Sequence, residues 1–104
     1  AHELAVDIHQ SEPVSDKVQC RELRAGIYFG DELLSNEVVL KFNSESSNPS
    51  ARYVPARMSL RAEADQHNSK DVELRLEEQI PNTTQWRLVT KAVYKLKRSF
   101  QADF

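Results

Sequence analysis

The chain has 104 residues, 39% of them hydrophobic and 29% charged, with a formal net charge of −2. This balance is typical of one globular domain with a buried core, and it excludes a disordered chain. No apolar run reaches the roughly 20 residues that a spanning helix needs, so a membrane-embedded chain is excluded too. The single Cys20 excludes an internal disulfide framework and favours a reducing, cytoplasmic compartment.

The first half of the chain predicts strands joined by loops. Three segments alternate apolar and polar residues with the period of two that is typical of a strand, the second less clearly: 4–8, 18–29 and 37–42. Segments rich in Ser, Pro, Asn and Asp predict loops at 10–17 and 43–50. Residues 31–36 predict either one helical turn or a plain connection. The only two glycines, Gly26 and Gly30, mark a bulge, a tight turn or a close backbone contact.

The second half predicts one more strand and then a long amphipathic hairpin. Apolar residues alternate from Ala56 to Ala62, and 65–70 reads as a turn. The hairpin has arms at 71–80 and 86–97, joined by the turn 81–84. Even positions of both arms are apolar and predict the core face: Val72, Leu74, Leu76, Ile80, Trp86, Leu88, Ala92, Tyr94 and Leu96. Charge favours the register with Leu76 opposite Leu88, because a shift of two residues places Arg75 opposite Lys91.

Six or seven short strands separated by regular turn signals predict an all-β fold. An immunoglobulin-like antiparallel β-sandwich is the first choice, and a small barrel is the alternative. We expect residues 1–104 to form a single domain. The start at Ala1 and the end at Phe104 resemble cut points, so we expect a piece of a larger protein, with a complete small protein as the alternative.

Charge is unevenly distributed along the chain. Residues 1–50 carry nine acids and four bases, whereas residues 51–104 carry seven acids and ten bases. Five bases and no acid lie between Gln79 and Ala102: Arg87, Lys91, Lys95, Lys97 and Arg98. Such a basic face can lie along phosphates and predicts a nucleic-acid contact. A solvated outer face, neutralised by Glu73 and Glu77 across the sheet, explains the same pattern.

The sequence contains no motif for catalysis or for metal binding. His2, His9 and His67 lack ligand spacing, and Cys20 has no second cysteine to form a zinc site. No nucleophile elbow, phosphate-binding loop or dinucleotide fingerprint is present. The adjacent Glu77 and Glu78 point to opposite faces of a strand and make a poor acid–base pair. We therefore expect no catalytic residue, metal or cofactor, unless folding itself brings such a cluster together.

The aromatic residues divide between core and surface. Trp86 and Tyr94 are in phase with the leucines, which favours a core role over a carbohydrate-binding face. Tyr53 lies in a loop and is the best candidate for a protein contact, together with Arg52 and Arg57. Asn82 begins the sequon 82–84 at the hairpin tip, which matters only in a secreted protein.

Three segments, 34–50, 72–81 and 94–104, resemble the C-terminal region of PglZ-type proteins. These are alkaline-phosphatase-superfamily proteins of bacterial BREX phage-exclusion systems, and the resemblance covers about residues 23–104. It implies a terminal β-sandwich of a larger protein whose metal-dependent, phosphatase-like core lies outside this sequence. No catalytic residue of that core carries over to any position here. The resemblance implies a non-catalytic accessory domain that contacts other defence-system proteins.

Overall fold

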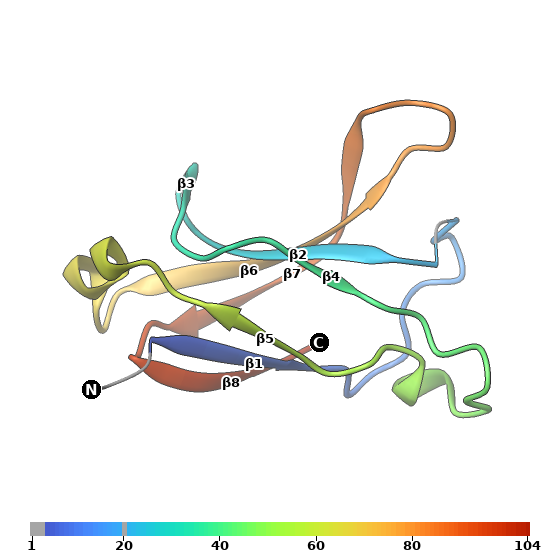
Figure 1. Cartoon of the computed structure of the whole chain (residues 1–104), viewed down its shortest axis with the longest axis horizontal. Coiled ribbons are helices and arrows are strands. Elements are labelled where there is room, and N and C mark those ends of the chain that lie inside the picture. The colour runs from blue at the N-terminus through green and yellow to red at the C-terminus, as the bar shows by residue number, and fades with distance from the viewer. Residues whose placement is uncertain (1–3, 20) are drawn as a thin grey trace.

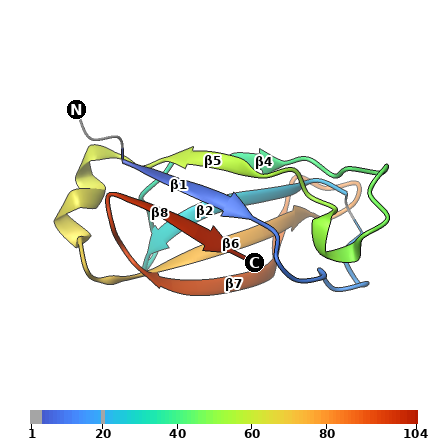
Figure 2. The same ribbon diagram turned by 90° about the horizontal axis from the view of Figure 1, so that it is seen from below.

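The computed structural model describes residues 4–19 and 21–104. They form two β-sheets that pack face to face (Figure 1). The strands are β1 (Ala5–His9), β2 (Leu23–Phe29), β3 (Glu32–Leu33), β4 (Val38–Leu40), β5 (Ala56–Ser59), β6 (Asp71–Gln79), β7 (Trp86–Lys95) and β8 (Ser99–Asp103). One sheet has the order β5-β1-β8, and the other has the order β3-β2-β6-β7 with β4 also paired to β2. Figure 2 looks onto the three-stranded sheet. The all-β sandwich expected from the strand pattern is confirmed.

The two helices among the described residues are short 3-10 segments, η1 (Pro49–Ala51) and η2 (Ala62–His67). Neither is long and apolar enough to cross a membrane. The side chain of Asn48 caps η1 by accepting a hydrogen bond from the Ser50 amide at 3.0 Å. Strand β5 ends at Ser59, although the apolar alternation that predicted it continues to Ala62. The strand is shorter because the chain enters η2 at Ala62.

The described residues form eight strands rather than the six or seven expected, and two of the eight, β3 and β8, were not predicted. Strand β3 occupies residues 32–33, where a helical turn or a plain connection was expected, and Gly30 makes the tight turn before it with φ +59°. Strand β8 pairs with β1 in parallel, whereas purely antiparallel sheets were expected. This pairing joins the two ends of the chain and leaves no local signal in the sequence.

The core lies between the sheets and draws on both of them. Its most deeply buried apolar side chains include Val6, Ile8, Leu23, Ile27, Leu34, Leu40, Met58, Leu74 and Leu76. Alternation places every second residue of β6 inward, which is the pattern of a strand with one wet face. Gly26 fits a close approach, since a Cβ there would lie 2.9 Å from Leu33 Cδ1. The core face expected for the first hairpin arm is confirmed at Val72, Leu74 and Leu76.

The hairpin of β6 and β7 forms as expected, but the register predicted from charge is wrong. Arg75 lies opposite Lys91, the arrangement that was expected to be disfavoured, and Leu76 does not face Leu88. Glu73 reduces the repulsion between the Arg75 and Lys91 cations. Its carboxylate lies 2.9 Å from the Arg75 Nε and 3.4 Å from the Lys91 Nζ, so one anion serves both.

The pairing of β6 and β7 shifts by one residue midway, and this places Glu77 opposite Leu88 and Gln79 opposite Trp86. A one-residue shift moves the following side chains to the other face of the sheet. Leu88 is consequently 50% exposed, and Trp86 lies on the outer face with the Arg24 guanidinium 4.1 Å from its ring centre. The core positions predicted for Trp86 and Leu88 are therefore wrong.

The sandwich is closed differently along its two sides. Next to β4 and β5 the backbone continues the pairing, with bridges between Ser35 and Leu60 and between Phe42 and Tyr53. Between β7 and β8, the Tyr94 side chain makes the connection, and its ring also packs against Phe100 at 5.9 Å between centres. The Tyr94 hydroxyl donates to the Asp103 carbonyl oxygen and accepts from the Asp103 amide at 3.0 Å.

Tyr94→Phe is expected to destabilise the fold by about 1–2 kcal/mol, because both backbone groups of Asp103 lose their partner. Burial raises the pKa of Tyr94, with the nearby Asp103 carboxylate adding to the effect, so the hydroxyl stays neutral and can donate at neutral pH. Urea unfolding measures the change. Tyr28→Phe is the matched control, since among the described residues the Tyr28 hydroxyl makes no hydrogen bond. Equal losses for the two variants would contradict the bridging role.

Candidate functional site

A cleft of about 440 Å³ opens at one end of the sandwich, between segment 13–19 and loop 42–53. These two segments lie at the same end of the molecule in Figure 1, on its right-hand side. Phe42 and Tyr53 give the cleft aromatic surface, and Asp16, Arg21 and Arg52 give it charge. The cleft is therefore a mixed apolar and cationic surface that several separate segments build together.

Gln10, which follows β1, holds this end of the molecule together. Its side chain is buried, at 3% exposure, and all of its hydrogen-bonding positions are used. The Nε2 donates to the carbonyl oxygens of Glu12 at 2.9 Å and Pro49 at 3.0 Å. The Oε1 accepts from the amides of Arg52 at 2.8 Å and Tyr53 at 3.0 Å. One amide side chain thus fixes both walls of the cleft relative to β1.

Most arginines of the chain have a carboxylate partner. Among the described residues, five arginines make six ion pairs: Arg24 with Glu37 and Glu77, Arg57 with Asp7, Arg75 with Glu73, Arg87 with Glu78, and Arg98 with Asp65. Within the described ranges, three arginines have none: Arg21, Arg52 and Arg61. Two of these three line the same cleft, so uncompensated guanidinium charge is concentrated there.

Arg21 is positioned by an aromatic ring. Its guanidinium carbon lies 5.4 Å from the centre of the Phe42 ring. A cation–π contact uses the face of the guanidinium and leaves its N–H groups available for an acceptor. Arg21 is consequently held in place and can still donate hydrogen bonds to a ligand.

Of the residues predicted to make a protein contact, one lies at the cleft with an exposed side chain. Arg52 is exposed there. Tyr53 was expected on the surface, but it is 7% exposed and packs edge-on against Phe42 with ring centres 5.7 Å apart. Arg57 lies on β5 and pairs with Asp7 at 2.8 Å. Arg21 is the residue that sequence reasoning missed, because nothing in the sequence links it to Arg52.

The basic series of the last strands does not form one continuous ridge. Arg87 points inward to the buried Glu78, because the shift in the hairpin places it on the other face from the lysines. Three others have acidic partners: Lys91 with Glu73, Lys95 with Asp71, and Arg98 with Asp65. Lys97 has no ion pair within the part of the chain that the structure describes. Most of the positive charge is therefore compensated locally.

The Glu73 carboxylate is expected to make stability sensitive to acid. Its hydrogen bonds to Arg75 and Lys91 hold the pKa of Glu73 below the ordinary glutamate value, although burial opposes this. A lowered folded-state pKa stabilises the fold above the unfolded pKa, and this contribution is lost as pH falls through the folded pKa. Glu73→Gln should therefore flatten the decline of stability on acidification. Urea midpoints recorded as the pH is lowered through and below the ordinary glutamate pKa measure this effect. An unchanged pH profile would contradict the role of Glu73.

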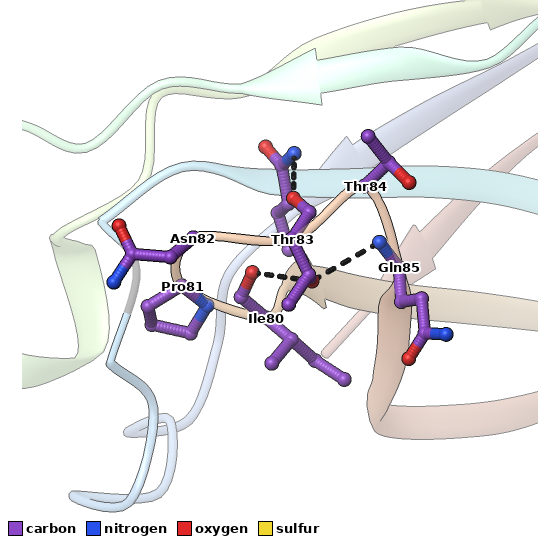
Figure 3. Close-up of a pocket in the computed structure, with 7 residues that line it drawn as sticks. Ile80, Pro81, Asn82, Thr83, Thr84 and Gln85 are labelled. Atoms are coloured by element: carbon purple, nitrogen blue, oxygen red, sulfur yellow. Dashed lines mark hydrogen bonds between the residues drawn. The ribbon is translucent and has the colours of Figure 1, made fainter.

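A second hollow lies within the hairpin tip, residues 79–85, and Figure 3 shows it. Several of its polar atoms are used inside the loop itself. The Thr83 Oγ1 donates to the Ile80 carbonyl at 2.7 Å and accepts from the Gln85 amide at 3.1 Å. Asn82 and Thr84 of the sequon point away from the loop. The tip is a self-contained turn with an exposed sequon.

Potential metal ligands are not gathered into one group in the part of the chain that the structure describes. Among residues 4–19 and 21–104, no three His, Cys, Asp or Glu side chains lie close enough to hold a metal ion. His67 stacks on Phe29 with ring centres 4.2 Å apart, and Glu77 and Glu78 lie on opposite faces of β6, as predicted. His2 and Cys20, which were considered as metal ligands, lie outside the described residues.

The chain was compared with protein-family models, with curated proteins and with solved structures. None of the three comparisons gave a match.

Proposed function

We propose that this chain is a non-catalytic interaction domain and that the cleft between segment 13–19 and loop 42–53 is its contact surface. The observation that carries the proposal is the pair of arginines at this cleft, which lack a carboxylate partner among the described residues. Elsewhere the fold places an acid beside five of its six other arginines, so charge left unpaired around a hollow favours a contact with another molecule.

The disposition of the acidic groups supports a non-catalytic role. Acid–base catalysis needs two groups that face one reacting centre. Glu78 is the one carboxylate buried among the described residues, and it already accepts from Arg87 at 2.6 Å and from the Gln19 amide at 2.8 Å. Its neighbour Glu77 binds Arg24 on the opposite face. These two carboxylates are committed to structure.

The resemblance of segments 34–50, 72–81 and 94–104 to PglZ-type proteins suggests where such a domain works. In this proposal the chain is the C-terminal accessory domain of a cytoplasmic, phosphatase-like protein of a bacterial BREX phage-exclusion system. Its partners are other proteins of that defence system. The phosphatase-like activity belongs to the rest of the parent protein.

Co-purification tests this function. The full-length parent protein is tagged and expressed with the other proteins of its defence system, with and without the region corresponding to residues 1–104. We expect at least one defence protein to be lost when the region is deleted, while the tagged parent is recovered in equal amount. Recovery of every partner by the shortened parent would contradict the proposal.

A nucleic-acid contact through β7 is the second candidate. Lys91 and Lys95 share the outer face of β7, and their side chains are 61% and 64% exposed. Their pairing with Glu73 and Asp71 weakens this candidate, because an acid beside each base repels phosphate. Fluorescence anisotropy with a single-stranded oligonucleotide decides the matter. Binding that falls with salt and is lost in the double variant Lys91→Gln, Lys95→Gln would establish it, and absence of binding at low salt would remove it.

A further inference from the structure

We propose that the cleft recognises an extended acidic peptide segment, in which a carboxylate side chain stands beside an apolar one. This inference rests on the proposed interaction function and names the chemical class of the partner. It commits Arg21 and Arg52 to the carboxylate and Phe42 to the apolar side chain.

The cationic part of the cleft offers two guanidinium groups as donors to a carboxylate. Guanidinium groups bind carboxylates through paired N–H donors, and such charge-assisted bonds are stronger than neutral ones. Phe42 holds the Arg21 guanidinium at 5.4 Å, and the Arg52 backbone amide is fixed at 2.8 Å from the Gln10 Oε1. The Arg21 guanidinium and the Arg52 backbone therefore start from anchored positions, so less freedom is lost when a ligand binds.

The apolar part is made by rigid groups. Pro13 and Pro49 stand on opposite walls, and Val14 and Val18 add aliphatic surface next to Phe42. Phe42 itself is packed against Tyr53 with an interplanar angle of 77°. Preformed hollows with apolar walls and a few fixed polar groups are typical of ligand sites. An apolar side chain that enters here removes its own surface and that of Phe42 from water.

Asp16 limits which acidic segments fit. It lines the same cleft and has no basic partner among the described residues, so it repels a second carboxylate placed near it. We therefore expect a segment with spaced acids to bind better than a continuous acidic run. The charge of Asp16 also provides a variant that should act in the opposite direction to those of the arginines.

A titration of the chain into labelled peptides tests the inference. The probe is a fluorescein-labelled peptide of alternating glutamate and leucine, and the comparison peptide carries glutamine in place of each glutamate. Anisotropy is recorded at low and high salt. Arg21→Gln and Arg52→Gln remove one charge each from the cleft, and Arg61→Gln removes the same charge elsewhere on the surface. Asp16→Asn removes the opposing charge.

The expected result is that the glutamate peptide binds more tightly than the glutamine peptide. Arg21→Gln and Arg52→Gln should each weaken binding about fivefold, Arg61→Gln should leave it unchanged, and Asp16→Asn should tighten it. The three arginines and Asp16 are exposed, so the variants should fold, and unfolding midpoints verify this. Equal binding of both peptides, or equal effects of the three arginine variants, would overturn the inference.

Two further outcomes separate this inference from the proposed function. If an oligonucleotide competes with the peptide and loses binding with the same two cleft variants, the cleft is a phosphate site and the peptide assignment falls. If deletion of the region loses defence partners but Arg21→Gln and Arg52→Gln in the full-length parent do not, the interaction function stands and the acidic-peptide assignment falls.

Discussion

Gln10→Ala is expected to destabilise the fold by about 3 kcal/mol, because four backbone groups, one of them on the buried Tyr53, lose their partner at once. A net hydrogen bond contributes about 1 kcal/mol, and a buried group left without a partner costs about 1–3 kcal/mol. Water can reach some of the vacated positions beside the cleft, which keeps the loss below the sum. Urea unfolding with a linear extrapolation measures the change.

Gln101→Ala is the matched control for this first prediction. Gln101 is exposed on β8, and its Nε2 donates to the Asp103 carboxylate at 2.8 Å. Its loss is expected to cost less than about 0.5 kcal/mol. Gln10→Glu separates donors from acceptors, since it keeps an oxygen for the amides of Arg52 and Tyr53 but faces two carbonyl oxygens with an anion. A loss below about 1 kcal/mol for Gln10→Ala would show that Gln10 does not hold the cleft walls.

Arg87→Met is expected to destabilise the fold by about 2–3 kcal/mol, since it leaves the Glu78 carboxylate without its cationic partner. The Glu78 side chain is 2% exposed and that of Arg87 is 42% exposed, so the anion is the buried member of the pair. Removal of a fully buried partner costs about 3–5 kcal/mol, and the partial exposure of Arg87 lowers the figure. The Gln19 amide, 2.8 Å from the Glu78 Oε2, retains its acceptor.

A double-mutant cycle isolates the ion pair. Glu78→Gln keeps an oxygen for the Gln19 amide and removes the buried charge, so the double variant with Arg87→Met should recover most of the lost stability. The expected coupling is about 1–3 kcal/mol. Lys91→Met is the control, because Lys91 is paired to Glu73 on the exposed face of the same strand and should cost no more than about 1 kcal/mol. Additive losses of Glu78→Gln and Arg87→Met would contradict a coupled pair.

The hairpin illustrates which parts of the fold follow from sequence. Alternation along β6 correctly predicts Leu74 and Leu76 as core, since a period of two is a local property of the chain. The misassignment of Trp86 and Leu88 comes from one shift in pairing, which depends on the neighbouring strand. The sequence contains one sign of this shift, because a charged residue, Arg87, occupies a position whose side chain faces inward. That signal is interpretable only once the buried Glu78 is known.

The cleft could not be predicted from the sequence for a similar reason. Arg21 follows the first loop and Arg52 follows η1, so only the fold brings them to one surface. The loop 43–50 was predicted, and the structure places the candidate Arg52 at the cleft with an exposed side chain. Tyr53 was assigned to the surface because it lies in a loop and was the aromatic residue that the core pattern explained least. The Tyr53 ring is buried because it packs against the rings of Phe42 and Phe104, which are distant from it in the sequence.

Peptide mapping on the isotope-labelled chain tests the central claim most directly. Backbone amide shifts are recorded by NMR while the alternating glutamate–leucine peptide is added. The proposed cleft predicts that the largest changes fall on residues 13–19, on Arg21 and Phe42, and on 49–53, with Lys91 and Lys95 unaffected. Changes confined to β7, or no changes at all at saturating peptide, would contradict an interaction domain that works through this cleft.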